Sequence, residues 1–516
     1  MAAVDRGEFS QQTTGLKVVM GMLKELEKAS IRYCHWKSNE HVHEGMVGVT
    51  DLDILVDKYP SDALNRVLAG AEFKRFATVP HNAYPGVEDY LAMDRDTGRL
   101  VHIHLHHQLV AGEAHLKGYR LPWEKLMLET RYWDSEHDIY VAEPNIEFLL
   151  LLVRATLKLR LRDRLLHMLG RDYFRGDFER EFNWLRERAD PGRVAQLAAE
   201  LLGQEAAVSC QRLIEGSPTF AELLNFRKLS MPLLREYRTY GVVEGKLRGL
   251  WRELHWLFGA VSRHYLLGHG LFRRVPSGGG VLVAFLGCDG SGKSSLAEDT
   301  AKWLSWKIDA MPVYLGSGDG PSSLLRWPMK VTLAALQKLG LLQKKQPAGT
   351  RGDDNRLSRG RSLLALVRPA LKVPWALALA LEKRGKLRRI TKARNKGMIV
   401  VCDRYPQSQV MGFGDGPLLN HWRNHPWKIK RILAAWEAIP YQKAELYPPD
   451  LIIKLQVTPE TALQRKGEMD IEECKRRVEA VKRLQYPPFT KVADVDANQI
   501  FDDVLLQVKR YIWEEV

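Results

Sequence analysis

The sequence predicts an α/β protein in two halves, and three patterns carry that prediction. Residues 281–296, VLVAFLGCDGSGKSSL, combine an apolar run typical of a buried strand with a glycine-rich loop and a helix start. From there to the C-terminus, apolar runs alternate with helical patterns, which is typical of a parallel sheet with helices on both faces. Residues 273–280, RRVPSGGG, are rich in Pro, Gly and Ser and predict a linker before this half.

Composition narrows the class of protein. The chain of 516 residues is too long for one core, and its 45% hydrophobic and 27% charged residues are ordinary for a globular protein. Its 5 cysteines are scattered, and the N-terminus has no apolar signal-peptide core, so we expect a cytoplasmic location. A net charge of +15 suits anionic partners such as nucleotides or acidic lipid. Nucleic acid is not indicated, because the sequence shows no zinc-finger, RNP-like or helix–turn–helix pattern.

The first half has two patterns of its own. Leu16 to Lys28 predicts an amphipathic helix and Asp51 to Val56 a short buried strand, whereas the residues after 145 are helical in period. We therefore predict an α+β domain over residues 1–145, a helical domain over 146–272, the linker 273–280 and an α/β domain over 281–516.

The second half contains further strands and one long insert. Val313–Leu315, Met398–Cys402 and Leu451–Leu455 predict the later strands. The insert, residues 321–390, is long for a connection, and charges and prolines interrupt its apolar stretch, so it does not predict a membrane span. Packing against the sheet is the favoured interpretation of this insert. The alternative is a basic amphipathic segment that rests on a membrane surface, which would make the protein membrane-peripheral.

The loop Gly287 to Ser294 fits the pattern G-x-x-x-x-G-K-S in full. Such glycines let backbone N–H groups converge on phosphate oxygens, and the helix start adds partial positive charge. Lys293 is expected to reach the β- and γ-phosphates, and Ser294 to ligate Mg²⁺. The motif predicts ATP and Mg²⁺ as cofactors, with a nucleotide-binding set of Gly287, Gly290, Ser291, Gly292, Lys293, Ser294 and Ser295.

The loop and three later stretches together resemble the thymidylate kinase family. The matching stretches are G-x-D-G-x-G-K-S, GMIVVCDRYPQS (397–408), PPDLIIKLQVTPETALQR (448–465) and VADVDANQIFDDV, in that order. The resemblance implies a P-loop kinase that transfers a phosphoryl group from ATP to a hydroxyl- or phosphate-bearing small molecule. It also implies a homodimer.

The same resemblance assigns roles to individual residues. It implies that Asp289 orients the acceptor, that Asp403 holds Mg²⁺ or the acceptor, and that Arg404 contacts the acceptor phosphate or the transferring group. Asp403 ends a strand, where ligands collect in parallel sheets.

The source of the transition-state cation is a further implication. One subgroup of the family carries an arginine in the loop, where this chain has Gly290, so the lid must supply the cation. Arg465 is the best-aligned candidate. Lys466, Arg476 and Arg477 are the others.

The chain departs from the family pattern where the acceptor is recognised. Gly-Ser-Gly follows Leu315, and MGFGDGP follows the Asp-Arg-Tyr stretch, in place of the family's residues. ATP use is therefore expected, and three functions stay open. These are a nucleoside monophosphate kinase, a kinase or nucleotidyltransferase acting on a sugar or lipid-linked saccharide in polysaccharide synthesis, and an ATP-binding regulator of low turnover.

A second pair of carboxylates lies in the first half. Asp51 and Asp53 stand two residues apart on the predicted strand, so both point to one face, as in a divalent-metal site. Lys37-Ser38 precede them, separated by residues 39–50. This order resembles the nucleotidyltransferase fold of the polymerase-β-like superfamily, which has Gly-Ser in that place. The resemblance implies a nucleotidyltransferase-like domain, and a purely binding or regulatory domain is the alternative.

That superfamily takes a third carboxylate from a later strand. The matching stretch here is RLVHIHLHHQL (99–109), in which His104 stands near the expected acid. His102, His104 and His106 alternate onto one face of this strand. Metal binding and burial with internal hydrogen bonds are both open for these imidazoles.

Overall fold

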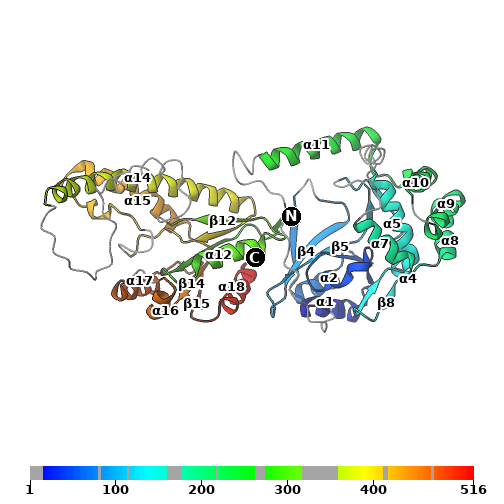
Figure 1. Cartoon of the computed structure of the whole chain (residues 1–516), viewed down its shortest axis with the longest axis horizontal. Coiled ribbons are helices and arrows are strands. Elements are labelled where there is room, and N and C mark those ends of the chain that lie inside the picture. The colour runs from blue at the N-terminus through cyan, green and yellow to red at the C-terminus, as the bar shows by residue number, and fades with distance from the viewer. Residues whose placement is uncertain are drawn as a thin grey trace. The chain divides into compact units, whose positions relative to one another are not determined.

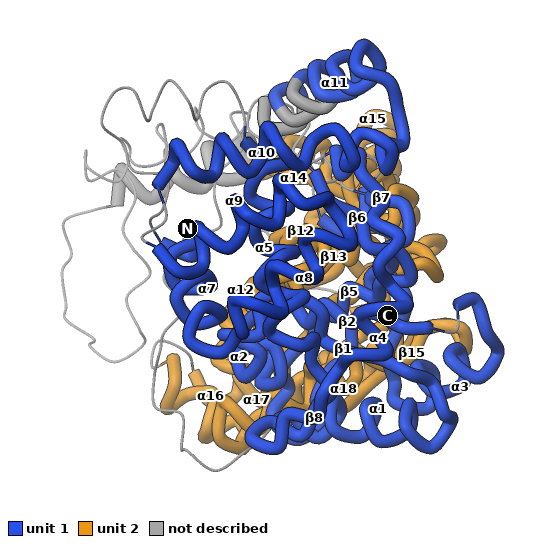
Figure 2. Tube along the Cα trace, turned by 90° about the vertical axis from the view of Figure 1, so that its right-hand side faces the viewer, with its two compact units in different colours: residues 1–274 blue, residues 275–516 orange. Residues whose placement is uncertain are grey.

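The computed structural model describes residues 15–57, 59–79, 83–112, 116–159, 176–216, 219–261, 273–316, 358–410, 416–466 and 470–516. The chain divides into two compact units, residues Met1–Arg274 and Val275–Val516, which Figure 2 shows in separate colours. The division falls inside the predicted linker, residues 273–280.

Unit 1 contains seven strands of a mixed eight-stranded sheet in the order β10-β3-β4-β5-β2-β1-β9-β8, and the eighth, β10, begins at Arg274, the last residue of this unit. Its strands are β1 (Tyr33–His35), β2 (Leu52–Val56), β3 (Lys74–Thr78), β4 (Val87–Met93), β5 (Leu100–His106), β8 (Tyr132–Asp134), β9 (Ile139–Val141) and β10 (Arg274–Pro276). A two-stranded ribbon is formed by β6 (Leu109–Ala111) and β7 (Tyr119–Leu121). Strand β2 is parallel to β5 and antiparallel to β1. The predicted strand at Asp51–Val56 is confirmed as β2.

Helices cover this sheet and continue beyond it. They are α1 (Lys17–Lys28), α2 (Val42–Met46), α3 (Asp62–Gly70), α4 (Glu124–Thr130), α5 (Pro144–Lys158), α7 (Asp177–Arg186), α8 (Pro191–Leu202), α9 (Gln204–Glu215), α10 (Phe220–Leu234) and α11 (Val242–Val261). The predicted amphipathic helix is confirmed as α1, and it buries Val19, Met22, Leu23 and Leu26 against the sheet core. The helical period after residue 145 is also confirmed.

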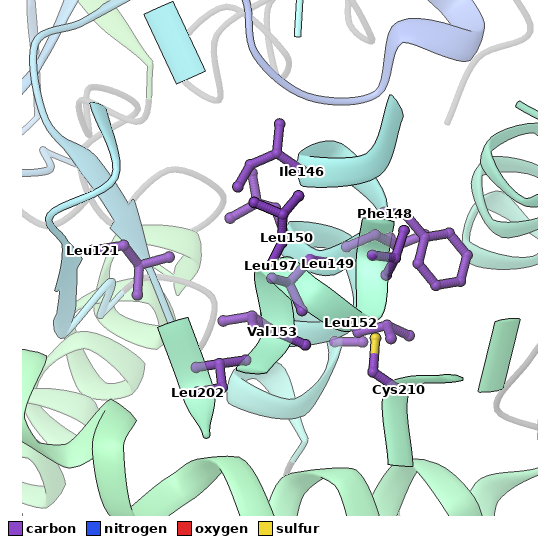
Figure 3. Packing of buried hydrophobic residues seen from close by; sticks show 14 of the residues in the cluster. Leu121, Ile146, Phe148, Leu149, Leu150, Leu152, Val153, Leu197, Leu202 and Cys210 are labelled. Carbon is purple, nitrogen blue, oxygen red and sulfur yellow. The ribbon is translucent and has the colours of Figure 1, made fainter. Parts of the chain in front are cut away.

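One core joins the sheet of unit 1 to its helical part. Helix α5 carries the run IEFLLLLV, and its residues from Ile146 to Val153 are all buried. The same cluster contains Trp36, Leu55 of β2, Leu197 of α8 and Cys210 of α9, and Figure 3 labels the last two. The prediction separated residues 1–145 from 146–272. In the structure every residue of α5 from Ile146 to Val153 is buried, so the helix packs on all sides and the two parts lie in one unit.

Unit 2 is built on a five-stranded sheet in the order β12-β13-β11-β14-β15, in which every pairing is parallel. Figure 1 labels β12, β14 and β15 of this sheet. The strands are β11 (Leu282–Gly287), β12 (Ala310–Tyr314), β13 (Ile399–Asp403), β14 (Leu451–Gln456) and β15 (Lys491–Asp496). The helices are α12 (Lys293–Leu304), α14 (Ser358–Asn395), α15 (Lys428–Leu446), α16 (Pro459–Arg465), α17 (Ile471–Arg483) and α18 (Phe501–Glu515). The α/β prediction for this half is confirmed.

The predicted insert is in part a helix of this unit. Helix α14 runs from Ser358 to Asn395 through both Pro369 and Pro374, and it packs along α15. Its later part buries Leu379, Leu387 and Ile390. Residues 321–357 of the insert lie outside the described residues. Among the helices that the structure describes, none has both the length and the apolar character needed to cross a membrane.

Candidate functional site

The predicted phosphate loop lies between β11 and α12, at the carboxyl edge of the parallel sheet. Gly290 and Gly292 have φ angles of 86° and 84°, a conformation that a side chain would strain. A Cβ atom at Gly287 would lie 2.3 Å from Ser291 Oγ, and one at Gly290 would lie 2.5 Å from the Ala462 carbonyl oxygen. The glycines are therefore required by the fold of this loop.

Lys293 lies within the loop, with its side chain 5% exposed. Its Nζ donates to the Cys288 carbonyl at 2.6 Å and lies 3.9 Å from an Asp289 carboxylate oxygen. Burial, together with repulsion from the neighbouring Arg404 and against attraction by Asp289, lowers the pKa of Lys293 to about 8. The ammonium group is thus held inside a loop whose geometry suits a phosphate, and a bound anion would compensate for its burial.

Ser294 and Asp403 come together from different elements. Ser294, in the first turn of α12, donates from Oγ to Asp403 Oδ2 at 2.6 Å, and Asp403 ends β13. The other carboxylate oxygen, Asp403 Oδ1, is buried and has no hydrogen-bond partner in the described part of the chain. A hydroxyl beside a carboxylate with an open oxygen fits a hard cation such as Mg²⁺.

Asp289 is the centre of a cluster of cations. Arg404 Nη2 donates to its Oδ1 at 2.7 Å, and Arg477 Nη1, from α17, donates to its Oδ2. Burial would raise the pKa of the Asp289 carboxyl, but Arg404, with Lys293 and Arg477, holds that pKa below its ordinary value. The carboxylate therefore keeps two arginines at the mouth of the phosphate loop.

The structure brings Arg477, and not Arg465, to this loop. Arg465 is at the end of α16 and donates from Nη1 to the Ala497 carbonyl at 2.9 Å. Arg476 contacts Glu472 and Glu473 on its own helix. The prediction aligned residues along the chain, and such an alignment does not say which face of α17 is turned to the loop.

Two remaining loop residues have different environments. Ser291 is 1% exposed, and its hydroxyl has no hydrogen-bond partner in the described part of the chain. Ser295 follows Ser294 on α12 and is exposed.

The predicted aspartates of unit 1 meet the histidines of β5. Asp53 is in register with His104, because β2 and β5 are parallel neighbours. Asp53 Oδ1 lies 3.0 Å from His106 Nε2 and 3.3 Å from His104 Nδ1, and Asp51 Oδ1 lies 2.7 Å from His102 Nδ1. Ligand atoms of Asp51, His102 and His104, and of Asp53, His104 and His106, lie within 4.8 Å of one another, which a metal ion could bridge.

Sequence reasoning missed a third aspartate, Asp89. It lies on β4 in register with His104, and its Oδ1 is 2.8 Å from His102 Nε2 and 2.6 Å from Arg274 Nε. The search for a third acid had followed β5, the strand parallel to β2. Asp89 comes from the next strand, which is antiparallel to β5, and VEDYLAM gives no metal-type spacing that could have identified it.

The Lys37-Ser38 pair is positioned by a buried polar chain. Lys37 Nζ is 2.8 Å from Asp53 Oδ2. Asn39, which follows Ser38, donates two hydrogen bonds to Glu147: from its backbone N to Oε1 at 3.0 Å and from Nδ2 to Oε2 at 2.6 Å. The Oδ1 atom of Asn39 lies 2.5 Å from His35 Nδ1. Glu147 belongs to α5, so the helical part of unit 1 holds this turn in place.

Comparison with known proteins finds relatives that match less than half of the chain. No protein-family model matches the chain. It is 29% identical over 238 residues to the uncharacterized ATP-binding protein YghR of Escherichia coli K12, and this match covers 45% of the chain and 86% of that protein. It is 26% identical over 230 residues to the uncharacterized ATP-binding protein YghS of the same strain, covering 43% of the chain and 89% of that protein.

Proposed function

We propose that this protein is an ATP- and Mg²⁺-dependent phosphotransferase of the thymidylate kinase-like type. The observation that carries the proposal is the meeting of Lys293, Ser294 and Asp403 at one edge of the parallel sheet, with one oxygen of Asp403 left open. The similarity to two proteins named as ATP-binding supports the nucleotide part of the proposal.

In this proposal the loop backbone and Lys293 bind the β- and γ-phosphates of ATP. Ser294 and Asp403 would hold Mg²⁺, which shields phosphate charge when it is bound. Little covalent chemistry is required of the protein in phosphoryl transfer, so its contribution is position and electrostatic stabilisation. The loop supplies both through groups that the fold fixes before ATP arrives.

Asp289 and its two arginines are assigned to the acceptor side. Arg404 and Arg477 both contact Asp289, so a charged acceptor group that enters beside this carboxylate meets two guanidinium groups already in position. Arg477 takes the role that the sequence had given to Arg465, the cation that stabilises charge developing on the transferred group. The acceptor is proposed to carry a hydroxyl or a phosphate, because a carboxylate orients the first and guanidinium groups bind the second.

The test is acceptor-dependent release of ADP by the full chain with Mg²⁺. Each acceptor is assayed alone: dTMP, other nucleoside monophosphates, sugars, sugar phosphates and lipid-linked saccharides. We expect one class to accelerate ADP release well above the rate with ATP alone. If ATP binds and no acceptor accelerates ADP release, the phosphotransferase proposal fails and the chain is a binding regulator.

A further inference from the structure

Unit 2 has a second surface, which the proposed phosphoryl transfer does not use. It belongs to residues 416–436, the loop before α15 and the first half of that helix. The side chains of Trp427, Ile429 and Ile432 are 65%, 66% and 55% exposed there. A single exposed apolar residue is ordinary, whereas several that lie close together mark a surface that binds something. We call residues 416–436 the basic-apolar surface.

Helix α15 places a small residue toward its neighbour and its bulky residues outward. Ala434 is buried in a cluster with Ala376 of α14, and the two helices pack along each other (Figure 1). Ile429, Ile432 and Ile439 are exposed, and their spacing puts them on one face of the helix, away from Ala434. A helix that only covered its own core would have the reverse arrangement, with its bulky apolar face inward.

The loop of the basic-apolar surface is held in place by specific contacts. The buried carboxylate of Glu437, on α15, accepts from the backbone N atoms of Leu418 and Leu419, each at 2.7 Å. Lys430 Nζ lies 4.9 Å from the centre of the Trp427 ring, a cation–π contact that supports this exposed tryptophan. The exposed apolar side chains therefore project from a fixed scaffold.

The same surface is positively charged. Residues 416–436 contain no Asp or Glu, and their Lys and Arg residues are Arg423, Lys428, Lys430 and Arg431. In the neighbouring stretch of α14, residues 372–395, Glu382 is the one acidic residue, and its carboxylate pairs with Lys386 at 2.7 Å. Cations and exposed apolar side chains thus share one surface without acidic residues of its own, which is the charge that complements an anionic partner.

We propose that the basic-apolar surface docks unit 2 on a membrane that contains acidic phospholipid. Headgroup phosphates accept from its Lys and Arg side chains, and Trp427, Ile429 and Ile432 enter the boundary between headgroups and acyl chains. Tryptophan is enriched at that boundary. A nucleic acid would match the charge and stack on an aromatic ring, but it offers no apolar medium to two isoleucines. Docking needs neither ATP nor phosphoryl transfer, so its test is independent of the proposed function.

The experiment is flotation of the full chain with vesicles. One set contains equal parts of phosphatidylcholine and phosphatidylglycerol, and the other contains phosphatidylcholine alone. We expect the chain to float with the acidic vesicles and not with the neutral ones. Two double variants, Ile429→Ser with Ile432→Ser and Arg423→Gln with Lys428→Gln, should each weaken this binding by about tenfold or more.

Matched controls separate this surface from the general positive charge of the chain. Ile500→Ser removes another exposed isoleucine of unit 2, and Lys24→Gln with Lys482→Gln removes two exposed lysines elsewhere. We expect both controls to bind the acidic vesicles as the parent chain does. Every altered position is exposed, so thermal unfolding of each variant should match that of the parent chain and show that the fold is intact.

A fluorescent label distinguishes insertion from attraction by charge alone. The 5 natural cysteines are all buried, so a nitrobenzoxadiazole label can be attached to Ile432→Cys alone. Its emission should rise when acidic vesicles are added, because the label leaves water.

Three outcomes would overturn the proposal. The chain does not float with acidic vesicles, or the controls weaken binding as much as the variants of the basic-apolar surface do, or the emission of the label stays unchanged on bound vesicles. A single-stranded oligonucleotide is titrated in parallel. Tight binding that the Arg423→Gln, Lys428→Gln variant loses, without any binding of vesicles, would assign the surface to nucleic acid instead.

Discussion

The phosphate loop of unit 2 and the aspartate cluster of unit 1 are built from similar parts. Each has a carboxylate on a strand of a sheet, and each has a lysine from a neighbouring loop. In unit 2 Lys293 donates to a backbone carbonyl, and Asp403 keeps one oxygen open. In unit 1 Lys37 lies directly on Asp53, and both oxygens are in use. A sequence motif therefore predicts where carboxylates lie close together. Whether they can bind a metal ion depends on the partners that each carboxylate oxygen already has.

The largest effect is expected at the loop lysine. Lys293→Ala should lower acceptor-dependent ADP release by about a thousandfold or more, because it removes a preorganised cation from charge that develops in transfer. ADP release is compared with that of Lys302→Ala, an exposed lysine later on α12. A rate within a few fold of the parent chain would contradict the role of the loop.

The next effect separates two arginines of the lid. Arg477→Ala should reduce kcat by about a hundredfold, in the range of a single preorganised donor, while Arg465→Ala should change it by only a few fold. We expect this difference in kcat because Arg477 contacts Asp289, whereas Arg465 contacts the Ala497 carbonyl. The reverse ranking in steady-state kinetics would return the role to Arg465.

A third prediction concerns the stability of unit 1. Lys37→Met should lower the free energy of unfolding by about 3 kcal/mol, because it leaves the Asp53 charge buried without its cation. Calorimetric unfolding of the full chain measures the loss, with the exposed Lys24→Met as control. The prediction fails if Mg²⁺ stabilises the parent chain through Asp53 and Lys37→Met leaves the free energy of unfolding unchanged. Asp53 would then bind a metal ion in the native protein and not Lys37.

The smallest effect is a pH dependence of nucleotide affinity. The pKa of Lys293 is lowered to about 8, so above pH 8 the ATP-free protein loses the ammonium charge. The dissociation constant for ATP should then rise, by up to about tenfold per pH unit. The free energy of unfolding of the ATP-free protein should instead rise between pH 8 and 10.5, because the buried Lys293 loses its charge in that range while the unfolded chain keeps it. Titration calorimetry at pH 7, 8 and 9 gives the first trend, and a flat profile would contradict it.

The sequence allowed much of unit 2 to be predicted because its signals are local. The strand, glycine loop and helix from Leu282 to Leu304 follow each other directly, and the Ser294–Asp403 contact follows from two adjacent parallel strands. Helix α14 was harder to predict, because Pro369 and Pro374 interrupt the apolar pattern of its sequence, whereas in the structure one helix continues through both.

Unit 1 was predicted less completely because its contacts are between distant residues. Asp89 reaches the cluster only through the β4–β5 pairing, and Arg274 arrives from the far end of the unit. The Glu147–Asn39 contact joins residues separated by 108 positions. The sequence shows that Lys37 stands where the resembling superfamily has glycine. Only the structure shows that this lysine forms an ion pair with Asp53.

Gly290 restricts how this protein can evolve. Its φ is 86°, and a Cβ atom there would lie 2.5 Å from the carbonyl oxygen of Ala462 on α16. A mutation that introduced an arginine into the loop would therefore collide with the lid before it could serve any substrate. Under the proposed function, in which Arg477 supplies the cation, an arginine at position 290 could take over that role only if α16 moved first. The close packing of Gly290 against Ala462 therefore limits which part of the chain can carry this charge.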